Sequence, residues 1–452
     1  MPPALIYLGV MLVVICLWFL LFKRPIYEGV ILSFVVLVVM TGTWGQVGNF
    51  FASAMKTSLL YSMVAFVAMS QVLTKTKIVD NCVRIIISLL GRIPGGAGYA
   101  SILASSFMGA LSGSGPGNVM ATGTITIPAM KKTGFPPELA ANVESTASYL
   151  GNMIPPSANI VAALGAYLAF APDREMTTGR FWVVCWGVSL WFVLARVAQL
   201  FVFCQVYKIR PMDKADIPPL RQTLKEGWSG LLLPVIILAP FVLDSVLNAT
   251  FITARLGAAG AKHFSSSLLI FVAGIAALYG LLVAKDKSVR SPRAIVNIFS
   301  KSVKGLAPIV ATCIFGYTIG ELFEYIEAGA QIKAVFETLN IGRVGLCFLV
   351  PLLTCFVTMV IPGSSVTVMF GTVFISLFAS AGVDPLLVAA MLPCMCGVMC
   401  GITPPFALGM YAGMSIAESD FDKTLKNDLW WVAVQYVMEV VVLLGWLPIL
   451  GL

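Results

Sequence analysis

The sequence has little charge and only one histidine. Of its 452 residues, 11% are charged and 59% are hydrophobic, whereas about 25% of the residues in a typical soluble domain are charged. Apolar runs of roughly 20 residues, long enough to cross a bilayer, recur from one end of the chain to the other. The composition therefore excludes an ordinary soluble protein and predicts an all-α polytopic membrane protein.

Residue patterns typical of metal binding and catalysis are also scarce. All ten cysteines lie in or beside apolar segments without the spacing of zinc ligands, and we interpret them as small packing residues. No nucleophile–base pair stands out, and neither a P-loop nor a paired-aspartate motif occurs, so an intramembrane enzyme has little support. The net charge of +8 does not require nucleic acid, because basic residues accumulate in the cytoplasmic loops of membrane proteins.

Two stretches broken by glycine and proline organise the chain. The first reads GALSGSGPGN and then GNMIPPSAN, and the second reads VIPGSSVTV and then CGITPPFAL. Gly113 and Pro155 are 42 positions apart and Gly363 and Pro404 are 41 apart, which indicates an internal duplication. Broken helices at corresponding positions of two halves mark the binding site of a secondary transporter.

The apolar runs divide into two repeats. In the first, 1–207, we expect scaffold spans within 1–75, a re-entrant helical hairpin at 97–131, a Pro-Pro-broken helix at 137–171 and a span at 181–207. A cytoplasmic linker at 208–228 leads to the second repeat, 229–452. This repeat has scaffold spans within 229–321, a hairpin at 343–380, a broken helix at 385–415 and a span at 427–450. The intervening segments 78–92 and 322–340 suit helices on the membrane surface.

The basic residues predict how these segments cross the membrane. If the N-terminus is outside and each hairpin returns to the side it entered, 21 of the 29 basic residues lie inside, seven lie outside, and Arg196 lies within a span. Positive charge favours the cytoplasmic side, so the bias supports re-entry. This threading places both termini outside and gives the two repeats inverted topologies.

The broken segments predict a site for an ion and an anion. Unwound carbonyls can replace the hydration shell of Na+, with hydroxyls helping, and half-helix N-termini suit a carboxylate. The Na+ candidates are Ser112, Gly113, Ser114, Asn118, Gly151, Asn152, Pro155, Gly363, Ser364, Thr367, Gly401, Thr403 and Pro404. The substrate candidates are Gly115, Pro156, Ser157, Asn159, Ser365 and Pro405. No other metal and no organic cofactor is expected.

Other interpretations exist for these residues. A glycine- and serine-rich patch often serves only close helix packing, but two copies at equal spacing favour a site. Among the ionisable residues, Glu144 precedes the first break and is an open candidate, whereas Arg196, Asp244 and Glu439 suit a scaffold ion pair or snorkelling. Asp428 is expected at a solvated helix end.

The run from Gly109 to Asn159 resembles the large membrane subunit of TRAP transporters, the tripartite ATP-independent periplasmic transporters. The SGSG tip, the TIPAMKKTGFPPELAA run and the PP break carry the resemblance, with GITPPF as the second-half counterpart. It implies an elevator-type carrier of the bacterial or archaeal inner membrane that imports an organic acid by Na+ symport. It also implies two partners, a small four-helix membrane subunit and a periplasmic substrate-binding protein.

Two alternatives remain. A stand-alone divalent-anion/Na+ symporter is thought to share the inverted-hairpin plan, although its tips read Ser-Asn-Thr and those here do not. A channel could also use broken helices. Uptake without a binding protein would favour the symporter, and flux without Na+ coupling would favour the channel.

Overall fold

The computed structural model describes residues 3–56, 58–76, 78–112, 115–171, 176–328, 330–331, 334, 338, 341–359, 363–404 and 407–452. Every regular element in these ranges is helical, as the composition predicts. Among the described residues, five helices are long and apolar enough to cross a membrane, or six if the pair 44–56 and 60–73, bent by 54°, forms one span.

The first half of the chain contains the expected hairpin and broken helix. The hairpin consists of α6 (Gly96–Ser112) and α7 (Gly115–Lys132), and the broken helix consists of α8 (Pro137–Leu150) and α9 (Ala158–Phe170). Before them come α1 (Pro3–Cys16), α2 (Ile26–Thr41), α3 (Val47–Lys56), α4 (Ser58–Thr76) and α5 (Ile78–Leu90), and α10 (Thr178–Val206) follows. Helix α3 was not predicted from the sequence and lies within the segment 1–75, which was expected to hold only scaffold spans.

The second half has the same order of elements. Its hairpin consists of α15 (Arg343–Thr358) and α16 (Gly363–Ser380), and its broken helix consists of α17 (Pro385–Leu392) and α18 (Leu408–Ala417). The flanking helices are α11 (Leu220–Leu247), α12 (Thr253–Val283), α13 (Pro292–Tyr325) and α19 (Phe421–Leu443).

Three boundaries differ from the sequence prediction. Helix α11 begins at Leu220, inside the expected linker, because Pro219 provides a start after which the chain remains helical. Helix α13 begins at Pro292 and is capped by Ser291, so the basic segment before the last scaffold span expected within 229–321 is partly helical. The second break opens with a π-helical turn at Pro393–Val398, well before the Pro-Pro pair, because Pro393 has no N–H to continue the α-helical hydrogen bonds.

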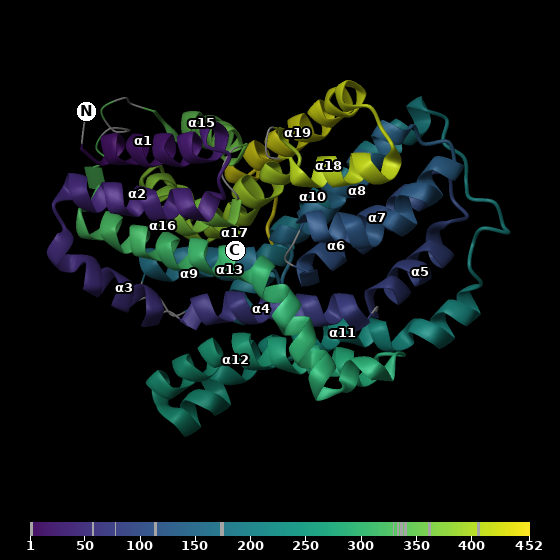
Figure 1. Cartoon of the computed structure of the whole chain (residues 1–452), viewed down its shortest axis with the longest axis horizontal. Coiled ribbons are helices and arrows are strands. Elements are labelled where there is room, and N and C mark those ends of the chain that lie inside the picture. Colours follow the sequence, from purple (N-terminus) through teal and green to yellow (C-terminus); the bar gives the residue numbers. More distant parts are fainter. Residues whose placement is uncertain are drawn as a thin grey trace.

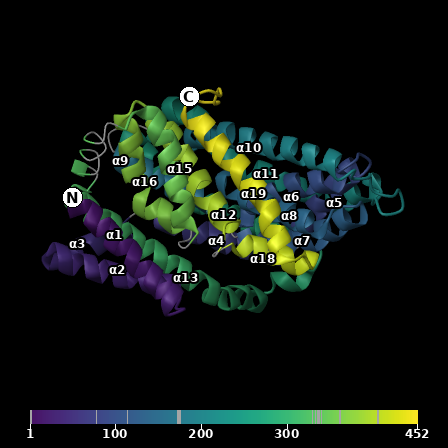
Figure 2. The ribbon, with the colours of Figure 1, turned by 90° about the horizontal axis from the view of Figure 1, so that it is seen from above.

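The broken helices are shared between two helical clusters (Figures 1 and 2). The first hairpin packs against α8 and also against α18, the last part of the second broken helix. The second hairpin packs against α17 and also against α9, the last part of the first broken helix. Each hairpin therefore contacts both broken helices, and the two breaks lie between the clusters.

Most of the remaining helices pack against one another, whereas two of them pack against the broken helices. Helix α4 packs against α12 and α13, α5 packs against α11, and α2 packs against α1 and α13. Large apolar side chains are exposed on their outer faces, for example Val235 and Val242 of α11 and Phe271 and Ile275 of α12. Exposed apolar side chains along helices of this length suit contact with lipid. Helices α10 and α19 instead pack against the broken helices.

Candidate functional site

The first hairpin lies directly against the first break. A methyl group added at Gly151 would be 2.4 Å from the Cα of Gly109, and one added at Gly109 would be 2.3 Å from the backbone oxygen of Ser148. Only glycine permits this approach of two backbones. The side chain of Asn118, one turn into α7, donates from Nδ2 to the backbone oxygen of Ser105 at 2.7 Å and to Ser148 Oγ at 2.9 Å. Hairpin and break thus form one unit.

A buried carboxylate ties the same helices together. Glu144 of α8 is fully buried, and five hydroxyls from three helices donate to it. Oε1 accepts from Ser105 at 2.7 Å, from Ser148 at 3.1 Å and from Thr122, and Oε2 accepts from Ser101 at 2.6 Å and Thr126 at 2.5 Å. The sequence left Glu144 as an open candidate because it could not show that hydroxyls four residues apart on α6 and on α7 would face it.

The second hairpin contacts the second break in the same manner. A methyl group at Gly363 would be 2.0 Å from the backbone oxygen of Cys396, so this approach also requires glycine. Thr367 Oγ1 donates to the backbone oxygen of Gly363 at 3.0 Å, and Thr403 Oγ1 donates to that of Met399 at 2.7 Å. Ser365 Oγ is buried and has no hydrogen-bond partner in the described part of the chain.

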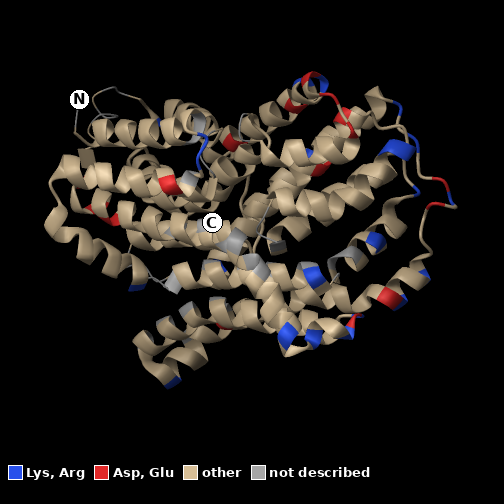
Figure 3. Ribbon diagram, viewed as in Figure 1, with Lys and Arg blue, Asp and Glu red and all other residues tan. Residues whose placement is uncertain are grey.

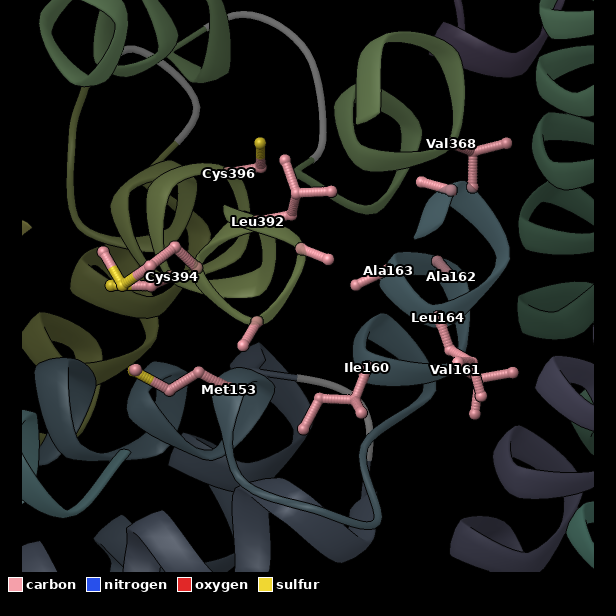
Figure 4. Packing of buried hydrophobic residues seen from close by; sticks show 14 of the residues in the cluster. Met153, Ile160, Val161, Ala162, Ala163, Leu164, Val368, Leu392, Cys394 and Cys396 are labelled. Carbon is pink, nitrogen blue, oxygen red and sulfur yellow. The ribbon is translucent and has the colours of Figure 1, made fainter. Parts of the chain in front are cut away.

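The two breaks meet each other. Asn152 Nδ2 donates to the backbone oxygen of Gly397 at 3.0 Å across 245 positions of sequence. Apolar side chains pack around this contact, and Met153 and Ile160 of the first broken helix share a buried cluster with Leu392 and Cys394 of the second (Figure 4). The unwound backbones of the two halves therefore lie in one place, as the repeated motif predicts.

Tyr149 fills the space between the halves, and the sequence analysis missed it. Its ring, 4% exposed, lies so close to three glycines that an added methyl group would be 2.3 Å from it at Gly115, 2.0 Å at Gly401 and 2.3 Å at Gly409. These glycines come from the first hairpin, the second break and α18. Nothing in the local sequence distinguishes Tyr149 from a packing residue, since its partners lie up to 260 positions away.

The structure locates most of the candidate residues around these contacts. Pro155, Pro156, Ser157 and Asn159 are buried, and Ser157 caps α9 by accepting from the backbone N–H of Asn159 at 3.2 Å. Gly113, Ser114 and Pro405 lie outside the described residues, as does the side chain of Ser112. The other Na+ and substrate candidates are buried except Ser364 and Pro404, which are half-buried.

The charged residues within the helices fall into two other groups. Asp428 is 1% exposed, so its assignment to a solvated helix end is wrong: this face of α19 packs inward, where Arg196 donates to the backbone oxygen of Trp431 at 3.0 Å and to Gln435 Oε1 at 2.8 Å. Glu439 follows on the same face and accepts from Gln435 at 3.1 Å. No ion pair within 4.0 Å joins Arg196 to these carboxylates among the described residues.

Asp244 forms the other group. It is 2% exposed and accepts from Ser265 at 2.7 Å and from Asn248 at 3.1 Å. All three residues belong to the α11–α12 region, away from both breaks.

The chemistry of the candidate site is that of oxygen ligands and helix ends. Hydroxyls, amide groups and unwound carbonyls are suitable ligands for Na+, and none of the candidates is a lysine or an arginine. Helices α7, α9, α16 and α18 all begin at a tip or a break, and helix N-termini stabilise negative charge. The residues present therefore fit a small cation and an anion bound together.

Solved structures with the same fold are transporters. The YdaH transporter of Alcanivorax borkumensis aligns over 92% of this chain and 90% of its own with a TM-score of 0.60 and 18% identity. MtrF of Neisseria gonorrhoeae aligns over 92% and 86% with a TM-score of 0.63 and 14% identity. At this identity the likeness shows the fold alone.

Sequence comparisons identify the family. The C4-dicarboxylate TRAP transporter large permease protein of Pseudomonas aeruginosa is 23% identical over 78% of this chain and 76% of its own. The sialic acid TRAP transporter large permease protein of Vibrio cholerae is 22% identical over 88% and 87%. The sequence model of the family described as "Tripartite ATP-independent periplasmic transporter, DctM component" matches residues 8–450. The chain is thus a multi-pass inner-membrane protein that belongs to this family as its large membrane subunit, a component of a transporter and not an enzyme.

Proposed function

We propose that this chain imports an organic acid by Na+ symport as the large permease subunit of a TRAP transporter. The named substrates of its relatives support this class, since C4-dicarboxylates, sialic acid and 2,3-diketo-L-gulonate are all organic acids.

The observation that carries the proposal is the meeting of the two breaks. Asn152 of the first break bonds to Gly397 of the second, and Tyr149 lies among glycines of both halves. Irregular backbone at membrane depth persists only where protein or a watery cavity satisfies it. Where two such segments meet beside two hairpin tips, their backbone oxygens can serve as ligands of an ion site.

The candidates divide between the two tips. Around the first hairpin, the tip and Gly151–Pro155 would hold one Na+, and around the second, the tip and Gly401–Pro404 would hold another. The carboxylate of the substrate would lie between them, near Ser157, Asn159 and Ser365. There the bound cations and the N-termini of the half-helices offset its charge, because the candidate set contains no basic side chain.

We further propose inverted repeats and an elevator movement. Lysines and arginines cluster along the linker at 207–219 and at the helix ends beside it, with others elsewhere on the molecule (Figure 3). Such a cluster is expected of a cytoplasmic side and supports termini that lie outside. The moving body would consist of the two hairpins, the two broken helices, and also α10 and α19, which pack against them.

Two partners complete the transporter. As a TRAP large subunit, this chain works with a small membrane subunit and a periplasmic substrate-binding protein. Transport by this chain alone at full rate would contradict that dependence and would move the assignment to a stand-alone symporter.

The first experiment is thermal unfolding of the purified protein in detergent, with NaCl titrated against KCl and choline chloride at matched ionic strength. A ligand that binds only the folded state stabilises it by RT ln(1 + [L]/Kd), about 2.7 kcal/mol at a hundredfold excess over Kd. We expect stabilisation by Na+ alone. Identical curves in the three salts would overturn Na+ symport and favour proton coupling or a channel.

A further inference from the structure

A groove of about 930 Å³ lies between α10 and α19. The two helices pack antiparallel, because Trp191 Nε1 of α10 donates to the backbone oxygen of Pro448, beyond the end of α19, while the ring centroids of Phe203 and Trp431, near its beginning, are 5.3 Å apart. The last turns of α10 and the first turns of α19 therefore lie at the same end of the molecule, where the basic linker follows α10.

Two stripes of residues with the same spacing form the walls of this groove. The stripe on α10 consists of Ala195, Ala198, Val202 and Val206, and the stripe on α19 consists of the residues at the same offsets, Lys423, Lys426, Trp430 and Val434. Residues at such offsets share one face of a helix. Val202, Val206 and Trp430 are more than half exposed, so no other part of the described chain covers the groove. Its two amide side chains, Gln199 and Asn427, accept hydrogen bonds from the interior.

The charged side chains of the groove lie at the end where α19 begins. Lys423 and Lys426 are exposed, and neither ammonium group has an ion-pair or hydrogen-bond partner among the described residues. The carboxylate of Glu138, at the start of α8, also lines the groove but forms no ion pair within 4.0 Å with either lysine. Two lysines against one glutamate leave a net positive charge at this end, which favours an anionic group there.

The length of the groove distinguishes between possible occupants. Ala195 and Val206 are 11 positions apart, which is about 16 Å at about 1.5 Å per residue. One leaflet supplies about half of a hydrocarbon core of about 30 Å, so the groove is about one leaflet deep. A membrane-spanning helix of another subunit would use the full thickness. The acyl chains of a phospholipid occupy one leaflet and place the phosphate at its edge, where the two lysines lie.

We propose that this groove binds an anionic phospholipid, with the acyl chains along the two stripes and the phosphate between Lys423 and Lys426. The lipid belongs to the leaflet on the side of the linker, and basic pockets between membrane-spanning helices on the cytoplasmic side suit such head groups. The ring of Trp430 lies next to the lysines along α19, and tryptophan favours the level of the head groups. The inference goes beyond the proposed function and requires no Na+ site.

The test measures how a lipid stabilises the full-length protein against thermal unfolding in detergent micelles. The probe is dioleoyl phosphatidylglycerol, and the reference is dioleoyl phosphatidylcholine, which has the same acyl chains and no net charge. Lys423→Gln combined with Lys426→Gln removes the two charges. Lys208→Gln combined with Lys214→Gln is the matched control, because it removes equal charge from exposed linker positions at the same end that do not line the groove. Ala198→Phe keeps both lysines and fills the apolar part.

The expected result is a loss of response to the anionic lipid in two of these proteins. A lysine beside an anionic lipid strengthens binding about fivefold, so the variant without Lys423 and Lys426 should need at least about tenfold more phosphatidylglycerol for half-maximal stabilisation. The linker variant should stay within about threefold of the wild type, and Ala198→Phe should lose at least about fivefold. The replaced side chains are exposed. If Ala198→Phe does not fold, Val202→Trp fills the groove from a position that is 58% exposed.

Equal stabilisation of the wild type by the two lipids would overturn the inference, as would equal losses in the two lysine variants. An unchanged response in Ala198→Phe would show attraction to a charged surface without a bound acyl chain. Stabilisation by inorganic phosphate alone would assign the lysines to a free anion. A change in particle mass by light scattering in Ala198→Phe, with its lipid response intact, would show that another protein chain occupies the groove. Each of these results would leave Na+ symport untouched.

Discussion

The contact between Tyr149 and Gly401 allows a sharp test of how the halves fit together. In Gly401→Ala, the new methyl carbon would lie 2.0, 2.1 and 2.2 Å from three carbons of the Tyr149 ring, whereas ordinary contacts of such carbons lie between 3.4 and 4 Å. The ring cannot turn aside, because Gly115 and Gly409 hold its other edge equally closely. The second break must therefore move by more than 1 Å relative to the ring.

The size of the effect follows from this overlap. Overpacking of a well-packed core costs about 1–3 kcal/mol, and we expect the upper half of this range because backbone rather than a flexible side chain must shift. Tyr149→Leu alone should also destabilise, by about 1–3 kcal/mol, because it leaves a cavity between the halves. In the double variant the smaller side chain makes room for the methyl group, so the two losses should fall short of additivity by at least about 1 kcal/mol.

Thermal unfolding in detergent, followed by tryptophan fluorescence, measures the four proteins of this cycle. Gly9→Ala is the control, because a methyl group there meets nothing within 4 Å and should leave stability unchanged or slightly higher. Na+ titration of the same samples should show a weaker response for Gly401→Ala than for Gly9→Ala. Additive losses in the cycle would refute the close fit of Tyr149 against the second break.

Two further substitutions test the contact between the two breaks and the proposed contact with the substrate. Asn152→Ala removes the amide donor to the Gly397 carbonyl, which still accepts from Cys400 Sγ at 3.2 Å, so the loss should be that of one hydrogen bond, about 0.5–1.5 kcal/mol. Unfolding measurements should show this loss, and Asn152→Asp, which lacks the donor as well, should not restore stability. Ser365→Ala removes a buried hydroxyl without a partner in the described residues, so the Na+-free protein should be as stable as the wild type or slightly more stable, because an unsatisfied buried polar group is removed. Its stabilisation by substrate should fall; an unchanged response to substrate would exclude Ser365 from the site.

The sequence located the hairpins and the breaks because glycine and proline determine the backbone where they stand. Helices α6–α7 and α15–α16 occupy, to within a few residues, the segments 97–131 and 343–380 that were expected to form hairpins. Proline frees the carbonyl one turn back, and this is a local property that needs no knowledge of the fold. The repeat of the motif then indicated that the two breaks meet, as the bond between Asn152 and Gly397 confirms.

The contacts within the site could not be predicted in the same way. Tyr149 becomes distinctive only when Gly401 and Gly409 are brought beside it, and Asp428 became buried because its face of α19 packs against the interior of the protein rather than water. The hydroxyls of Glu144 come from three helices whose relative rotation the hydrophobic pattern does not fix. The sequence shows where the backbone breaks, but the rotation of each intact helix depends on packing between distant segments.

Different side chains pack against the break in each half of the chain, so the two proposed ion sites have different electrostatic surroundings. In the first half a carboxylate inside the broken helix gathers hydroxyls from its own hairpin. In the second half the equivalent position is Pro393, and the neighbouring Cys394 instead donates to Glu439 of α19 at 3.4 Å, beside Gln435 and Arg196. A positive guanidinium thus accompanies the second carboxylate but not the first. The two breaks therefore differ both in their backbone geometry and in the charged side chains beside them, so the two halves are not equivalent at the place where they meet.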